Sequence, residues 1–278
     1  KDSAPFVERF PVNVTDLNEL TQQALSKRFL WLFLDYDGTL SDFTPTPETI
    51  DPDQQICDLL SRLSSQPGIR LAVISGRRLR DVQSLLPVKG IYLAGTYGIE
   101  LLMPDGTLVQ RVELDAIQPF LENVKPKWLE IIADEHGFYL EDKNWALALH
   151  AKLGSDEDAR RVLALAREIV ERELPEEQFR ILGGHKFLEA APLLAHKGRT
   201  VSYLLEKYPL PNPQMLYIGD DDKDEEAFEI VNTHGGIAIK VISEAQSSQP
   251  TRAQYTLESP AAVHAWLESL LTKLKESK

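Results

Sequence analysis

The sequence predicts an α/β protein with a doubly wound parallel sheet and a smaller α+β unit inserted into it. Short apolar runs, typical of buried strands, alternate with amphipathic helical patterns in both the first and the last third of the chain. Between about residues 113 and 190 the alternation gives way to hairpins and two long helices. Polar clusters follow several of the apolar runs, as loops do at the carboxyl edge of such sheets, where ligands bind.

Before residue 113 we expect helices and strands in turn, followed by a hairpin. Apolar residues spaced i, i+3, i+4 and i+7 indicate helices, and unbroken apolar runs indicate strands buried on both faces. An irregular loop with three prolines is expected at 41–52. The expected elements are a helix around 17–25, a strand at 30–35, a helix at 53–64, a strand at 69–74, a helix around 79–86, a strand at 91–94, and hairpin strands at 99–103 and 107–112.

The insert and the last third of the chain follow the same rules. In the insert we expect a helix at 117–135, hairpin strands at 137–142 and 145–152, a helix opened by Ser155, and strands at 178–182 and 186–191. The alternation then resumes with a helix at 197–208, a strand at 215–219, a helix at 224–231, strands at 236–241 and 255–257, and a last helix beginning at Ser259-Pro260. These patterns predict a core of residues 1–112 and 191–278 and an inserted domain of residues 113–190.

Composition narrows the class of protein. The chain has 278 residues, of which 43% are hydrophobic and 26% charged, as in ordinary globular domains. The net charge of -13 argues against nucleic-acid and membrane surfaces, which need clustered Lys and Arg. One cysteine, Cys57, excludes an intramolecular disulfide and suits a reducing cytosol. With no apolar run of membrane-spanning length, and no apolar core of a signal peptide in residues 1–5, we expect a cytoplasmic protein that acts on a small molecule.

The first core strand ends in two carboxylates. The apolar run 30–34 leads directly into Asp35-Tyr36-Asp37-Gly38-Thr39. Side chains two apart on extended backbone point the same way, so Asp35 and Asp37 should project together. Two like charges this close need a cation or a proton between them. The loop therefore predicts a metal-assisted acid/base or nucleophilic site.

Three further polar clusters occupy equivalent places. Ser75 ends the second strand, Lys197 precedes a helix just after the insert, and Asp220-Asp221-Asp222-Lys223-Asp224 ends the strand at 215–219. Neighbouring parallel strands release their loops at one edge, so we expect these clusters to converge. Taken singly, Ser75 would be interpreted as a helix N-cap and Lys197 as a solvated lysine.

This set of groups fits phosphoryl transfer through a carboxylate nucleophile. Asp35 would attack phosphorus, and Asp37 would protonate the leaving oxygen and later take a proton from water. Ser75 and Lys197 would hold the phosphoryl oxygens. Mg²⁺ prefers a few carboxylates together with phosphate and water oxygens, so it is the expected cofactor. Its expected ligands are Asp35, the Asp37 carbonyl and Asp220, with Asp221 or Asp224 behind it.

Together these motifs resemble those of the haloacid dehalogenase superfamily of phosphatases, and the insert resembles the α/β cap of that superfamily. The closer resemblance, over roughly residues 30–240, is to trehalose-6-phosphate phosphatases. It rests on 34–41, Ile74-Ser75-Gly76-Arg77, Glu141-x-Lys143 with His150, Leu188-Glu189-x-x-Pro192, Lys197-Gly198 and 218–228. The resemblance implies a Rossmann-like core with a cap, and Mg²⁺-dependent hydrolysis of trehalose 6-phosphate.

The resemblance also implies substrate-binding residues. Glu141, Lys143 and Glu189 would meet the sugar hydroxyls, although a hairpin pair such as Glu141 and Lys143 is ordinarily a solvated face. The remaining expected substrate-binding residues are Gly38, Thr39, Gly76, Arg77 and His150; Arg77 would contact phosphate or pair with a carboxylate. The chain departs from the family pattern at Thr96-Tyr97-Gly98, where Glu-His-Gly is usual, and at Ala151-Lys152, where an aromatic and an Arg commonly follow the histidine.

Other functions fit the same motifs. One is a phosphatase for another phosphorylated glycoside, such as sucrose phosphate or mannosyl-3-phosphoglycerate, and a second is a sugar phosphotransferase or mutase on the same fold. The intact set of acids and lysine argues against a third, a non-catalytic sensor of sugar phosphates. We expect a monomer, with association with a trehalose-6-phosphate synthase as a further option.

Overall fold

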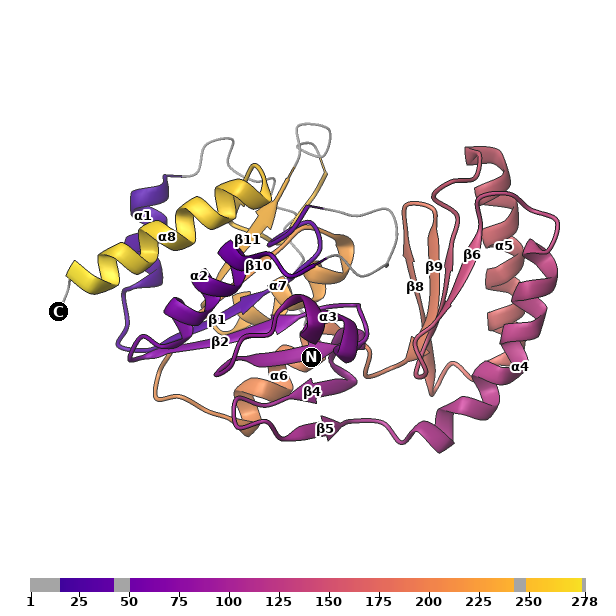
Figure 1. Cartoon of the computed structure of the whole chain (residues 1–278), viewed down its shortest axis with the longest axis horizontal. Coiled ribbons are helices and arrows are strands. Elements are labelled where there is room, and N and C mark those ends of the chain that lie inside the picture. The colour runs from indigo at the N-terminus through magenta and orange to yellow at the C-terminus, as the bar shows by residue number, and fades with distance from the viewer. Residues whose placement is uncertain (1–15, 43–50, 243–248, 277–278) are drawn as a thin grey trace, which may run out of the picture.

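The computed structural model describes residues 16–42, 51–242 and 249–276. Figure 1 shows two lobes side by side: a large lobe built from both ends of the chain, and a small lobe that runs from α4 (Leu114–Ile132) to β9 (Phe187–Pro192). Most of the loop expected at 41–52 lies outside the described residues. Among the residues described, no helix combines the length and apolar character needed to cross a membrane.

The large lobe holds an eight-stranded sheet in the order β12-β11-β10-β1-β2-β3-β4-β5, of which β12 to β3 pair in parallel and β4 and β5 are antiparallel. Its strands are β1 (Leu30–Leu34), β2 (Ile69–Ile74), β3 (Tyr92–Gly95), β4 (Glu100–Leu102), β5 (Leu108–Gln110), β10 (Gln214–Gly219), β11 (Ile237–Val241) and β12 (Tyr255–Leu257). Its helices are α1 (Leu17–Ala24), α2 (Gln54–Ser64), α3 (Leu79–Leu85), the 3₁₀ turn η1 (Thr96–Gly98), α6 (Lys197–Lys207), α7 (Asp222–Thr233) and α8 (Pro260–Glu276). This arrangement confirms the predicted α/β class.

The central strand β1 is buried on both faces because helices cover both sides of the sheet. Leu30, Leu32 and Leu34 pack into a core formed with α1, α2, α3 and α8. Trp31 and Phe33 point the other way, into a core with α6 and α7. This period of two explains why the strand has no polar residue before Asp35.

Strand register brings the ends of the central strands together. Leu34, the last residue of β1, lies opposite Ile218 of β10 and Val73 of β2. The loops that follow these three parallel strands therefore leave the sheet at one edge, as the sequence predicts.

The small lobe is an antiparallel sheet in the order β6-β7-β9-β8, with two helices packed on one face. Its further elements are β6 (Tyr139–Asp142), β7 (Leu147–His150), α5 (Asp156–Glu173) and β8 (Phe179–Gly184). Figure 1 shows α4 and α5 on the side away from the large lobe and the sheet on the near side. Strand β9 continues to Pro192, past the expected domain boundary at 190.

Several elements begin or end a few residues from their expected bounds, and in two of them the local reason is visible. Strand β7 begins at Leu147 and not at 145, because Asn144 has a left-handed φ of 68° and the Trp145 N–H bonds to the Lys143 carbonyl in a tight turn. Helix α7 begins at Asp222, two residues early, because Asp221 and Asp224 form a capping box.

Candidate active site

The predicted polar clusters meet at the carboxyl edge of the large sheet. Asp35 follows β1, Ser75 follows β2, Asp220 follows β10, and Lys197 is the first residue of α6. The Lys197 ammonium donates to Asp35 Oδ1 at 2.8 Å and to Asp224 Oδ1 at 2.6 Å, and all three side chains are buried. Lys197 is therefore a buried cation between two buried carboxylates and not a solvated surface lysine.

Asp224 organises the acidic loop. Its Oδ1 also accepts the Tyr217 hydroxyl at 2.7 Å, and its Oδ2 accepts the backbone N–H groups of Asp220 at 2.9 Å and Asp221 at 3.1 Å. With four donors, this carboxylate has no acceptor site to spare. Tyr217 was not among the predicted site residues; the available signal was a hydroxyl-bearing residue inside a buried strand, three positions before Asp220.

Carboxylate oxygens of Asp35, Asp220 and Asp224 lie within 4.8 Å of one another. The Thr39 hydroxyl lies 3.4 Å from Asp35 Oδ2 and 3.5 Å from Asp220 Oδ1. Gly38 makes room for this approach, since it has a φ of 78° and a Cβ there would lie 2.1 Å from Asp220 Oδ2. Gly38 and Thr39 thus shape the acidic site.

The electrostatics of this cluster show an excess of negative charge. Burial, followed by the neighbouring Asp224, raises the pKa of Asp35 to about 7, and burial together with Asp35 raises the pKa of Asp220. Burial opposes the charge on Lys197, but Asp224 and Asp35 outweigh it and raise the lysine pKa well above its ordinary value. One lysine cannot balance three acids, so the donor set fits a hard divalent cation bound by carboxylate oxygens. Because the two oxygens of Asp224 already accept four hydrogen bonds, Asp35 and Asp220 are the side chains that could ligate it.

Asp37 pairs with the guanidinium of Arg77. Arg77 Nε and the Arg77 terminal nitrogen Nη2 lie 2.8 Å from the two Asp37 oxygens, a bidentate fork. Of the two expected roles for Arg77, the structure shows the carboxylate pair. The Arg77 backbone N–H donates to Ser75 Oγ at 3.1 Å, while α3 begins after Arg78 without a side-chain cap, so Ser75 does not cap that helix.

The expected sugar-binding residues form two pairs. His150 Nε2 lies 2.8 Å from Glu141 Oε2, and the His150 ring stacks on Tyr139 at 4.4 Å. Burial opposes ionisation of Glu141, but the hydrogen bond with His150 and the charge of Lys143 outweigh it and lower the pKa of Glu141. This pair is only partly buried, and the positive charge of Arg77 also contributes to lowering the pKa of Glu141.

The second pair lies deeper. Lys143 Nζ is 2.8 Å from Glu189 Oε1 and donates to the Gly76 carbonyl at 3.0 Å. The Tyr97 hydroxyl donates to Glu189 Oε2 at 2.7 Å. Lys143 is 4% exposed and Glu189 fully buried, so this part of the hairpin is not a solvated face. From the sequence, Tyr97 was expected only as a departure from the family pattern, with no role in the site.

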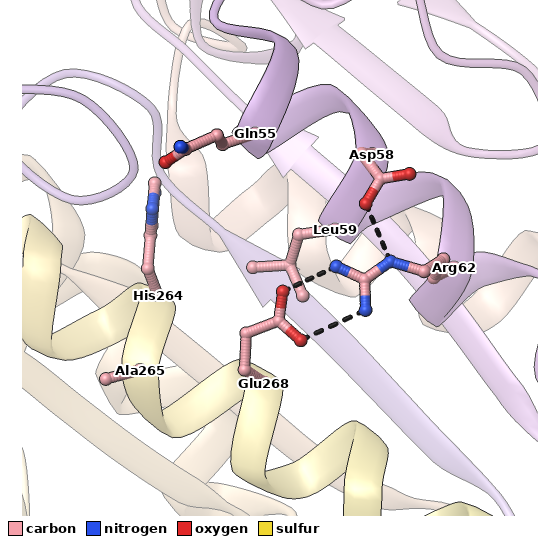
Figure 2. A pocket seen from close by; sticks show the side chains of 7 residues that line it. All are labelled: Gln55, Asp58, Leu59, Arg62, His264, Ala265 and Glu268. Carbon is pink, nitrogen blue, oxygen red and sulfur yellow. Dashed lines mark hydrogen bonds and ion pairs between the residues drawn. The ribbon is translucent and has the colours of Figure 1, made fainter.

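A separate hollow of about 390 Å³ lies between α2 and α8 (Figure 2), lined by Gln55, Asp58, Leu59, Arg62, His264, Ala265 and Glu268. The Arg62 guanidinium is neutralised there by Asp58 and Glu268. None of the predicted site residues lines this hollow, so it is distinct from the strand-end site.

A doubly wound core with these strand-end groups and an inserted lobe has the architecture of the haloacid dehalogenase superfamily. The family model for trehalose-phosphatase matches residues 33–261. The chain therefore belongs to the trehalose-phosphatase family.

Individual relatives agree with the family match. The chain is 30% identical over 247 residues to a trehalose-phosphate phosphatase of Mycobacterium marinum, a match that covers 87% of this chain and 62% of the relative. It is 31% identical over 250 residues to the trehalose-phosphate phosphatase of Mycobacterium tuberculosis strain H37Rv, covering 88% and 62%. The chain thus spans about 62% of the length of these curated relatives.

Solved structures share the fold. The C-terminal domain of Candida albicans trehalose-6-phosphate phosphatase superposes with a TM-score of 0.83 at 21% identity, covering 95% of this chain and 99% of that domain. A trehalose-6-phosphate phosphatase related protein gives a TM-score of 0.74 at 20% identity, covering 89% of this chain and 100% of that one.

Proposed function

We propose that this chain is a Mg²⁺-dependent phosphatase that hydrolyses trehalose 6-phosphate to trehalose and inorganic phosphate. The observation that carries the proposal is Lys197 held between Asp35 and Asp224, with Asp220 beside them, at the ends of β1 and β10. This arrangement supplies a nucleophile, a positive charge to balance a phosphoryl group, and oxygen ligands for a cation. The choice of trehalose 6-phosphate as the substrate rests on membership of the trehalose-phosphatase family.

In the first half of the reaction, an oxygen of Asp35 attacks phosphorus and the bond from phosphorus to the sugar oxygen breaks. Asp37 gives its proton to that leaving oxygen, so trehalose departs as a neutral alcohol. Lys197 and the Ser75 hydroxyl hold the other phosphoryl oxygens and balance the charge that develops on them. The product of this half is an aspartyl-phosphate on Asp35.

In the second half, Asp37 takes a proton from water, and the water oxygen attacks phosphorus. The bond from phosphorus to Asp35 breaks, which releases phosphate and regenerates both acids. In the structure both carboxylate oxygens of Asp37 accept hydrogen bonds from Arg77, so neither oxygen is open to the leaving group or to water. We therefore propose that the arriving phosphate attracts Arg77 away from Asp37, which frees Asp37 to carry a proton.

Mg²⁺ would be held by the side chains of Asp35 and Asp220 and by the Asp37 carbonyl. When bound, it would neutralise charge on the phosphoryl group and keep Asp35 ionised. Asp224 would position Asp220 and Lys197, and Asp221 would stand behind Asp220 as the N-cap of α7. Gly38, Thr39 and Gly76 would shape the phosphate end of the substrate site.

We propose that the inserted domain, residues 113–190, acts as a cap and binds the sugar end of the substrate. Glu141, Lys143, His150 and Glu189 would recognise the disaccharide hydroxyls. Closure of the cap would exclude water before the aspartyl-phosphate forms. The same proposal takes the enzyme as a cytoplasmic monomer, with association with a trehalose-6-phosphate synthase as an additional expectation.

The test is a panel of phosphorylated sugars assayed for released phosphate with Mg²⁺ present. We expect trehalose 6-phosphate to give the highest kcat/KM, at least tenfold above sucrose phosphate and mannosyl-3-phosphoglycerate. A clear preference for another member would overturn the substrate assignment and leave the phosphatase chemistry intact. Transfer of phosphate to an added sugar, with little free phosphate, would identify a phosphotransferase or mutase instead.

A further inference from the structure

The turn that follows β3 has an uncommon backbone. Thr96, Tyr97 and Gly98 have consecutive positive φ values of 46°, 56° and 103°. Glycine adopts this region freely, whereas a threonine and a bulky tyrosine do so at a cost. Backbone strain of this kind persists only where surrounding contacts enforce it, and it concentrates at functional sites.

The main chain of this turn is hydrogen-bonded to the loop that carries Ser75 and to the helix that begins with Lys197. The Tyr97 N–H donates to the Ser75 carbonyl at 2.9 Å, and the Thr96 N–H donates to the Arg77 carbonyl at 2.7 Å. On the other side, the Thr200 hydroxyl donates to the Tyr97 carbonyl at 2.8 Å, from the first turn of the helix that begins with Lys197. The backbone of Tyr97 thus links the Ser75 loop to the Lys197 helix.

The Tyr97 side chain reaches the small lobe. Its hydroxyl donates to Glu189, which pairs with Lys143, and the Lys143 ammonium returns to the Gly76 carbonyl in the Ser75 loop. Lys143 also lies 5.4 Å from the centre of the Tyr97 ring. Tyr97 and Lys143 are each 4% exposed and Glu189 is fully buried, so water does not substitute for these contacts.

Two other polar contacts between the lobes are weaker candidates for holding them together. The ion pair of Arg180 with Glu226 and the bond from Lys223 to the Gly183 carbonyl both involve partly exposed groups, which water can solvate when the contact breaks. The Tyr97 hydroxyl and the Lys143 ammonium are the buried groups whose polar contacts join the two lobes beside the Ser75 loop.

We propose that Tyr97 is a positioning residue that holds the cap closed through Glu189 and fixes the closed cap to the loop carrying Ser75 and Arg77. The proposal rests on the proposed function, since it gives Tyr97 the task of aligning the sugar-binding cap with the phosphoryl-transfer centre. The Tyr97 backbone links the Ser75 loop to α6, and the Tyr97 hydroxyl aligns β9 with this pair through Glu189.

The test variant is Tyr97→Phe, which keeps the ring and removes the hydroxyl. We expect kcat/KM for trehalose 6-phosphate to fall roughly tenfold to a hundredfold, because buried Glu189 loses a donor and the cap loses its alignment. Hydrolysis of p-nitrophenyl phosphate, which offers no sugar to the cap, should fall less than threefold. Hydrogen exchange of the substrate-free protein should become at least fivefold faster in β9 and in the turn 143–145.

The matched control is Tyr208→Phe, which removes a tyrosine hydroxyl at the end of α6, where the ring packs on Tyr92 and not on the site. It should change none of the three measurements. Equal losses on both substrates in Tyr97→Phe, or unchanged exchange in β9, would overturn the proposal. If the wild-type protein hydrolyses p-nitrophenyl phosphate but not trehalose 6-phosphate, the substrate assignment fails, while the exchange comparison still decides the role of Tyr97.

Discussion

Asp224 offers the sharpest test of how the catalytic centre is held together. It is fully buried and accepts four hydrogen bonds, from Lys197, Tyr217 and the backbone of Asp220 and Asp221. Asp224→Asn keeps the shape of the side chain but replaces one acceptor oxygen with an NH₂ group. The two donors that bond to the replaced oxygen would then face the NH₂ group, which is itself a donor. Lys197 would also lose one of the two carboxylates that balance its charge.

The size of the effect follows from burial. Removing one partner of a buried ion pair costs about 3–5 kcal/mol, and Lys197 keeps Asp35 as a second partner, which places the expected loss at the lower end, about 3 kcal/mol. Urea denaturation of the metal-free proteins measures it, with the slope of the transition checked for equality. We also expect kcat to fall by a factor of roughly 100, equivalent to about 3 kcal/mol in the activation free energy, because Lys197 and Asp220 lose the carboxylate that positions them.

Asp222→Asn is the matched control, because Asp222 lies in the same first turn of α7 and is exposed. It should change the free energy of unfolding by less than about 0.5 kcal/mol. If Asp224→Asn costs less than about 1 kcal/mol and retains normal turnover, Asp224 does not organise the site and the reasoning is refuted.

Three further outcomes follow from the site. Asp35→Asn should reduce phosphate release by a factor of at least 10⁴ while far-ultraviolet circular dichroism stays unchanged, because an amide is not a nucleophile; normal turnover would contradict the assignment of Asp35. Arg77→Ala should raise KM for the phosphorylated substrate roughly tenfold. Arg77→Lys should give a KM between those of the wild type and Arg77→Ala, since lysine keeps the charge but not the bidentate fork. An unchanged KM in Arg77→Ala would show that Arg77 does not bind the phosphate. Because burial raises the pKa of Asp35 to about 7 and raises the pKa of Asp220 as well, both proposed ligands must lose a proton before they bind Mg²⁺. Calorimetric Mg²⁺ affinity should therefore rise by more than about tenfold per pH unit below about 7 and continue to rise less steeply above it, where Asp220 still has a proton to lose; affinity independent of pH between 5.5 and 7 would argue against these ligands.

The core of the site could be predicted from the sequence because it depends on backbone geometry. Apolar runs locate the strands, parallel pairing places their ends at one edge, and residues such as Asp35 and Asp220 follow directly. Lys197 was predictable only from its position after the insert, since nothing in its neighbours distinguishes it from a surface lysine. The meeting of these side chains at one edge of the sheet is therefore the part of the site that the sequence pattern predicts.

The rest depends on side-chain contacts between segments far apart in the chain. No pattern around Tyr217 indicates that its hydroxyl would bond to Asp224, and none around Tyr97 indicates a bond to Glu189. The order β6-β7-β9-β8 places Glu189 beside Ala148, a pairing that strand periodicity cannot specify. Pairing of Arg77 with Asp37 was one of two expected roles, and only the three-dimensional arrangement distinguishes them.

The parallel pairing of β1 with β10 has a consequence for how the protein folds. Asp35 and Lys197 are 162 residues apart in the chain, and contacts of such long range form slowly because a large loop must close first. The small lobe has its own sheet and its own apolar cluster, formed by residues between 117 and 190, so its contacts are more local. We therefore expect the cap to gain its structure early, and the acids of the first strand to stay without their lysine until the last third of the chain docks on the sheet.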